Sequence, residues 1–252
     1  MIGKIIGAVV LVLVVAAGFW SWTHRSMIVL PGTPDTHVLQ GSATATGDLK
    51  YTEDKPYYTI SATYPAKTDF SGAANTKARL TIERTIESMI ATFKTDNKLD
   101  SLSPEDIQIQ GLGEDRKYAL NLEYKEYHSA DYDSFVYTIY EDTLGAHPNG
   151  YYLTFVFDKN GDRIQLANLF QGTDYRNKIA TEAQKQVIAE LTKRAGADAS
   201  DSYYSEGLSA NDENFSNFYV DGDTLGILFP PYQVAAYAAG SFEVRIPFSQ
   251  IK

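Results

Sequence analysis

The chain has 252 residues and a formal net charge of −10 at pH 7, from 22 Lys and Arg against 32 Asp and Glu. A composition with 44% hydrophobic and 21% charged residues is typical of a folded protein and not of a disordered one. The negative charge argues against nucleic acid as a partner, because phosphate binding requires a cationic surface. The chain has no cysteine, which excludes disulfides, thiolate metal sites and a cysteine nucleophile.

The first segment, residues 5–23, carries no charged residue and is predicted to cross a lipid bilayer as a single helix. Lys4 precedes it, and Trp20 and Trp22 lie at its far end, where indole rings favour the lipid–water boundary. A cleaved signal peptide is the alternative, but the bulky residues at the end of the segment do not fit a cleavage site. We expect residues 1–25 to be an uncleaved anchor in the cell membrane, with the N-terminus inside.

The remainder of the chain is predicted to lie outside the cytoplasm on a flexible tether. Residues 26–49 are rich in Pro, Gly, Ala, Ser and Thr, and they have little apolar surface to bury. Beyond residue 25 all 32 acids but only 20 of the 22 bases remain, so the exported part has a net charge of −12.

The next region, residues 50–110, is predicted to be a small α+β module. The stretch from Tyr57 to Tyr64 alternates apolar and polar positions, as a half-buried strand does. Isoleucines and other apolar residues from Ile82 to Phe93 recur at helical spacing, and Asn75 or Thr76 is expected to cap this helix. A turn is expected at residues 103–105.

Residues 117–252 are predicted to form a second module that begins with strands around 118–124 and 135–139. A strand at 151–158 is expected to turn through Asn160-Gly161 in a type I′ hairpin and to return over 163–166. A calcium-binding loop is the alternative for Asp158-Lys159-Asn160-Gly161-Asp162. It lacks the glycine at the sixth position and the glutamate at the twelfth that such loops require.

The second module continues with a helix, a hairpin and a last strand. Apolar residues recur every fourth position over 174–194, which predicts a helix. Residues 218–229 carry a Gly-Asp turn between two apolar runs, and 242–246 alternate as a final strand. The predicted fold class is therefore α+β: a transmembrane helix followed by two small modules, each an antiparallel sheet packed by a helix.

Two phrases in the second module carry a family resemblance. Residues 145–152 read GAHPNGYY, and residues 228–247 read LFPPYQVAAYAAGSFEVRIP. Together they resemble the paired domains of unknown function in bacterial envelope proteins. Those domains form the outer part of RsiV-like lysozyme-sensing anti-sigma factors and the N-terminal part of PdaC-type peptidoglycan deacetylases. The resemblance is good over residues 117–252 and looser over residues 50–110.

The resemblance implies a binding or sensor module whose ligand is a lysozyme-like muramidase or peptidoglycan. Only four residues precede the anchor and the chain ends soon after the family phrase, so we expect neither a sigma-factor-binding segment nor a deacetylase domain. Exposed tyrosines suit either ligand, because each combines an apolar face with a hydroxyl. The alternative is that these residues only shape turns. The candidate contact residues are Gly145, Ala146, His147, Pro148, Asn149, Tyr151, Pro231, Tyr232 and Tyr237.

Two other functions remain open from the sequence. A peptidoglycan-modifying hydrolase would depend on His128 or His147, because the other two histidines lie in the anchor region and the tether. No nucleophile, zinc-protease or phosphate-binding motif is present, so no catalytic residue, metal ligand or cofactor is predicted. A scaffold or assembly protein without a soluble ligand also fits a tethered outer domain.

Overall fold

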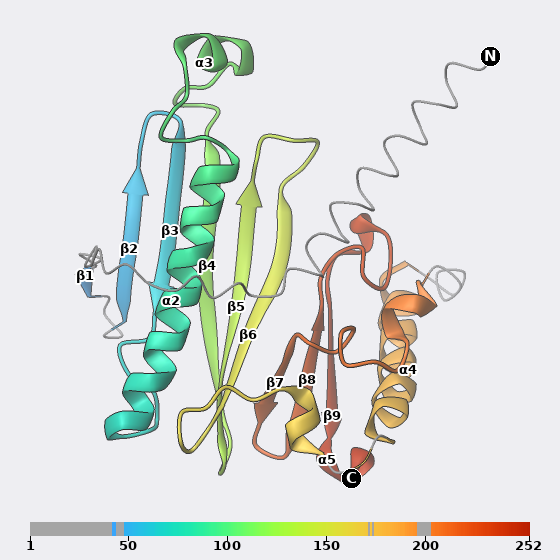
Figure 1. Ribbon diagram of the computed structural model, residues 1–252. Coiled ribbons are helices and arrows are strands. Elements are labelled where there is room, and N and C mark those ends of the chain that lie inside the picture. Colours follow the sequence, from blue (N-terminus) through green and yellow to red (C-terminus); the bar gives the residue numbers. More distant parts are fainter. Residues whose placement is uncertain (1–41, 44–47, 171, 173, 196–202) are drawn as a thin grey trace, which may run out of the picture. The chain divides into compact units, whose positions relative to one another are not determined.

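The computed structural model describes residues 42–43, 48–170, 172, 174–195 and 203–252 (Figure 1). The predicted anchor and nearly all of the predicted tether lie outside these residues. Gln40–Lys252 form one compact unit. Among the described helices, none combines the length and the apolar character that a membrane crossing requires.

The larger sheet has six strands in chain order from β1 to β6. Its neighbours pair antiparallel except β3 and β4, which are parallel. The prediction of an antiparallel sheet is therefore wrong here, because the chain leaves β3, passes through two helices and enters β4 from the same end. The predicted division between modules, at 110–117, lies in the connection between β3 and β4, and these two strands pair in one sheet. The strands are β1 Ser42–Ala43, β2 Leu49–Asp54, β3 Tyr58–Tyr64, β4 Tyr118–His128, β5 Tyr132–Asp142 and β6 Asn149–Asp158.

Helix α2, Gly72–Asp96, lies across one face of this sheet (Figure 1). Its predicted apolar stripe is confirmed, since Ile82, Ile86 and Phe93 are buried. The predicted cap is wrong: the helix begins after Ser71, and the side chain of Asn75 instead accepts a hydrogen bond from the Thr68 amide. The expected turn at 103–105 opens a second helix, α3 Pro104–Gln110, through a capping box of Ser103 and Asp106.

The turn after β6 differs from the expected type I′ hairpin. Only Gly161 has a positive φ, 71°, whereas type I′ requires two such residues. The Asp158 carboxylate accepts the amides of Asn160 and Asp162, each at 2.9 Å, and this closes the loop. The chain then makes a single bridge at Arg163 and enters the short helix η1 Leu166–Leu169, so the predicted return strand does not form.

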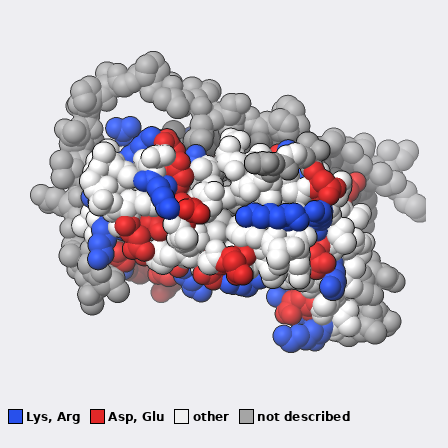
Figure 2. All heavy atoms as spheres, turned by 90° about the horizontal axis from the view of Figure 1, so that it is seen from below, with Lys and Arg blue, Asp and Glu red and all other residues white. Residues whose placement is uncertain are grey.

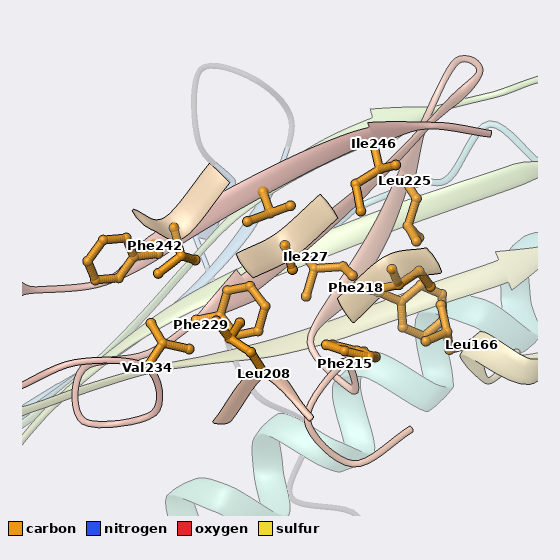
Figure 3. Packing of buried hydrophobic residues seen from close by; sticks show 14 of the residues in the cluster. Leu166, Leu208, Phe215, Phe218, Leu225, Ile227, Phe229, Val234, Phe242 and Ile246 are labelled. Atoms are coloured by element: carbon orange, nitrogen blue, oxygen red, sulfur yellow. The ribbon is translucent and has the colours of Figure 1, made fainter. Parts of the chain in front are cut away.

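The second sheet is antiparallel, in the order β7, β8, β9, and it confirms the predicted hairpin and last strand. Helix α4, Tyr175–Ala195, buries its predicted stripe on one face of this sheet. Figure 3 shows the aromatic and aliphatic side chains of this core packed together. The remaining elements are β7 Phe218–Asp221, β8 Thr224–Phe229, β9 Phe242–Pro247, η3 Ser205–Leu208, η4 Tyr237–Ala239 and α5 Phe248–Ile251.

The other face of the second sheet packs on β4, β5 and β6. Tyr219 and Leu228 lie against Val136, so the contact is apolar. At its edge, the Ser134 hydroxyl donates to the Val220 carbonyl and accepts from the Val220 amide, at 3.2 and 3.0 Å. A buried hydroxyl satisfied in both directions fixes β7 on β5.

Candidate functional site

The two predicted contact segments meet in space although about 85 residues separate them. The rings of His147 and Tyr237 stack with centroids 4.0 Å apart. The Tyr232 ring lies 5.3 Å from that of Tyr237, and its hydroxyl lies 3.2 Å from Nε2 of His147. We call His147, Tyr232 and Tyr237 the aromatic cluster.

The carbonyl of Pro148 holds two members of the aromatic cluster in place. It accepts a hydrogen bond from the Tyr237 hydroxyl at 3.0 Å, and Nδ1 of His147 lies 2.9 Å from it. A carbonyl only accepts, so Nδ1 must carry the proton. In the neutral imidazole, Nε2 is then the acceptor for the hydroxyl of Tyr232. The β5–β6 loop and the β8–β9 connection are thus joined through a defined tautomer.

Tyr232 is the exposed member of the aromatic cluster, with 55% of its surface accessible. Its φ is 72°, in the left-handed region that few residues other than glycine adopt. The turn is held by Gln233, whose side-chain Nε2 donates to the Asn214 carbonyl at 2.9 Å, and by the buried side chain of Val234. A large ring is therefore held toward solvent on a firmly anchored turn. Backbone strain of this kind is common at binding sites.

The remaining predicted residues divide into two groups. Gly145, Ala146 and Asn149 are exposed in the same β5–β6 segment, and Pro231 precedes Tyr232. Tyr151 does not join the cluster, because its hydroxyl donates to the Glu141 carboxylate at 3.0 Å.

Sequence reasoning missed Tyr152, whose hydroxyl donates to the Ser241 hydroxyl at 2.9 Å and ties β6 to the β8–β9 connection. Successive strand residues face opposite ways, so Tyr151 and Tyr152 could not both point to one site. This alternation is the signal that was available in the sequence.

A second group of polar side chains lies at the β4–β5 hairpin, where no motif predicted one. Nδ1 of His128 is 3.1 Å from carboxylate oxygens of both Asp69 and Asp133. Its Nε2 is 3.8 Å from the carboxylate of Glu126. We call His128, Asp69 and Asp133 the hairpin triad. His128 and Asp133 pair directly across β4 and β5, while Asp69 comes from the loop before α2.

The electrostatics of the hairpin triad favour a positive charge. Burial opposes protonation of His128, but its hydrogen bond to Asp133 and the neighbouring carboxylates outweigh burial and raise its pKa. Burial also raises the pKa of Glu126, and the acids nearby add to this effect. Within the described residues, the ligand atoms of the hairpin triad lie within 4.8 Å of one another, close enough to share a cation.

Comparison with known proteins finds a matching family model and solved structures with the same fold. Residues 167–249 match the family model DUF3298, a protein of unknown function. Two crystal structures of DUF3298 family members share the fold. One, from Bacteroides fragilis, has a TM-score of 0.57 and 19% identity over 80% of this chain and 89% of its own. The other, from Pseudomonas aeruginosa PAO1, has a TM-score of 0.56 and 14% identity over 81% and 90%. The C-terminal part of the chain is therefore similar to the DUF3298 family, and the described fold resembles that of two of its members.

A characterised relative adds to this assignment. The chain is 30% identical over 140 residues to the peptidoglycan-N-acetylmuramic acid deacetylase PdaC of Bacillus subtilis (strain 168). The match covers 54% of this chain but only 29% of the deacetylase. The resemblance to PdaC-type proteins is therefore confirmed as a distant relationship. The resemblance to lysozyme-sensing anti-sigma factors stays a prediction.

Proposed function

We propose that this chain is a non-catalytic binding module of the bacterial cell envelope that recognises peptidoglycan through the aromatic cluster. In this proposal residues 5–23 anchor it in the cell membrane and the folded unit lies outside. The observation that carries the proposal is the meeting of His147, Tyr232 and Tyr237 from two distant loops. Exposed groups of large apolar side chains often mark binding sites, and the Tyr232 ring of this cluster is 55% exposed.

The chemistry of the aromatic cluster suits a glycan. The apolar face of a sugar ring packs on an aromatic ring, while tyrosine hydroxyls bond to sugar hydroxyls. Tyr232 presents an exposed ring, and its hydroxyl, which donates to Nε2 of His147, can still accept a hydrogen bond from a sugar hydroxyl. The relative's name states that it acts on peptidoglycan. This supports the same polymer as the ligand here.

A basic muramidase is the second candidate, favoured by one specific observation. The net charge of −12 beyond residue 25 would accelerate the approach of a cationic protein. On the face seen in Figure 2, acidic and basic side chains are interspersed, and neither sign forms a continuous patch. Attraction by this surface would therefore be long-range and would not depend on one patch. We therefore rank the muramidase behind peptidoglycan as the ligand.

Purified sacculi provide the direct test. The full-length wild-type chain, the Tyr232→Ala variant and the Tyr237→Ala variant are each sedimented separately with sacculi in detergent. We expect the wild-type chain to co-sediment and each variant to lose binding by roughly tenfold or more, because stacked aromatics dominate such contacts. Tyr57→Ala is the matched control and should bind normally, since Tyr57 lies at the β2–β3 turn, across the sheet from the β5–β6 loop.

Three results would contradict the proposal. Sacculi that fail to retain the wild-type chain exclude peptidoglycan, and retention of a basic muramidase on immobilised chain would then support the second candidate. Equal binding by the Tyr232 and Tyr237 variants would remove the aromatic cluster from recognition. Release of acetate or of soluble glycan fragments by the chain would show an enzyme.

A further inference from the structure

We propose that the hairpin triad, His128, Asp69 and Asp133, is a divalent metal site, with Zn²⁺ as its first candidate. The proposal is independent of the ligand of the aromatic cluster. Neither the family model nor the relative's name assigns a metal to this part of the chain. It also goes beyond the sequence, where positions 69, 128 and 133 form no spacing motif.

The backbone brings the ligands together on rigid elements. His128 and Asp133 are opposite residues of an antiparallel pair, so their side chains share one face of the sheet. The His128 carbonyl accepts the amide of Gly222 from the β7–β8 turn at 2.8 Å, which holds the hairpin end. Two of the three ligands therefore need no loop rearrangement to meet an ion.

Contacts with the other two members of the triad orient the buried ligand, Asp133. Asp133 is 3% exposed. One of its oxygens accepts the backbone amide of Asp69 at 2.9 Å, and the other faces Nδ1 of His128 at 3.1 Å. Metal sites commonly fix their ligands by such outer hydrogen bonds. Because Asp69 also supplies a side chain, one residue both orients Asp133 and offers its own oxygen.

The negative charges around His128 favour the binding of a cation. Three carboxylates, of Asp69, Asp133 and Glu126, surround one imidazole. In the described part of the chain, His128 is the only basic residue that forms an ion pair with any of them. A divalent ion bound by the hairpin triad would balance the charges of its two aspartates, with His128 as a neutral ligand.

The donor set selects the kind of metal. One imidazole nitrogen and carboxylate oxygens are ligands typical of Zn²⁺, whereas Ca²⁺ and Mg²⁺ prefer oxygen alone. In a tetrahedral zinc site, neighbouring ligand atoms lie roughly 3.3 Å apart, given metal–ligand bonds of about 2 Å. The two 3.1 Å separations at Nδ1 are close to this value. Such an ion would join the loop before α2 to the β4–β5 hairpin.

Zinc titration of the metal-stripped full-length chain tests the site. Competition with a chromogenic chelator gives affinity and stoichiometry, and the melting temperature gives a second readout. We expect one equivalent of Zn²⁺ and a higher melting temperature. Asp69→Asn and His128→Gln should weaken binding by about tenfold or more, because even losing an outer partner of a ligand has that effect. Asp131→Asn is the matched control, since this neighbouring acid pairs with Lys159 instead and should leave binding unchanged.

The outcomes separate cleanly. The proposal is overturned if Zn²⁺ does not bind saturably. His128 would then act only as an ion-pair partner of the acids. Equal affinity in Asp69→Asn, a change at an exposed residue that should not prevent folding even if His128→Gln does, also overturns the proposal. Equal competition by Mg²⁺ would remove the imidazole as a ligand. None of these results bears on sacculus binding.

Discussion

At the scale of single residues, the structure depends on close approaches that the composition does not reveal. Tyr219 is fully buried and stacks on Tyr127 with ring centroids 4.1 Å apart. Its ring crosses β8 directly over Gly226. Glycine is required there for space and not for backbone conformation, because any Cβ would enter the ring of Tyr219.

The first prediction follows from this contact. Gly226→Ala should destabilise the protein by about 2 kcal/mol, because the Tyr219 ring is packed from both sides and cannot retreat. Urea denaturation measures the change. Gly150→Ala is the control, a strand glycine with open space at its Cβ position. Equal losses in the two variants would show that chain flexibility, and not the ring contact, sets the cost.

At the scale of elements, the start of α4 is tied to the loop after η3 by one carboxylate. Asp212 accepts hydrogen bonds from the Tyr175 hydroxyl at 2.6 Å and from Nε of Arg176 at 2.9 Å. The hydrogen bonds from Arg176 outweigh partial burial and lower the pKa of Asp212. A lowered folded-state pKa stabilises the fold above the unfolded value and loses this contribution as the pH falls through the folded one.

The second prediction uses this sign. Asp212→Asn should cost about 1 kcal/mol at pH 7, a modest value because the pair is partly exposed to water. The difference from wild type should shrink steadily below pH ~4, where the unfolded carboxyl begins to protonate. Chemical denaturation at several pH values checks it. Asp115→Asn, at an exposed acid, should change stability by less than ~0.5 kcal/mol throughout. A pH-independent difference at Asp212 would disprove the electrostatic account.

The elements also show what could be predicted from the sequence. Helices α2 and α4 were predictable because their apolar stripes depend only on local spacing. The parallel pairing of β3 with β4 was not, since an alternating strand looks the same in either orientation. The turn after β6 failed for a local reason, because the side chain of Asp158 closes it instead of two positive-φ residues.

The candidate sites show the same limit. The two segments of the aromatic cluster were found through a resemblance, and their contact across about 85 residues became visible only in the fold. The hairpin triad left no trace in the sequence. Asp69 reaches it through the path of the loop before α2, which no local pattern encodes.

At the scale of the whole molecule, two cores share the strands β4 to β6. One face of the larger sheet takes α2 (Figure 1), and part of the other face, over β4 to β6, takes the second sheet through Val136, Tyr219 and Leu228. Both proposed sites lie where segments that belong to different sheets meet. The aromatic cluster joins the β5–β6 loop to the β8–β9 connection, and the hairpin triad adjoins the β7–β8 turn through Gly222.

The last prediction concerns the independence of this unit. Removing residues 1–25 should yield a soluble monomer, because Gln40–Lys252 form a compact unit with buried cores of their own. Analytical ultracentrifugation and a cooperative thermal transition test this. The stability of the truncated chain should equal that of the full-length chain in detergent. Aggregation, or a lower melting temperature, would show that the first segment packs on the fold, and the assignment of residues 5–23 to the membrane would then be wrong.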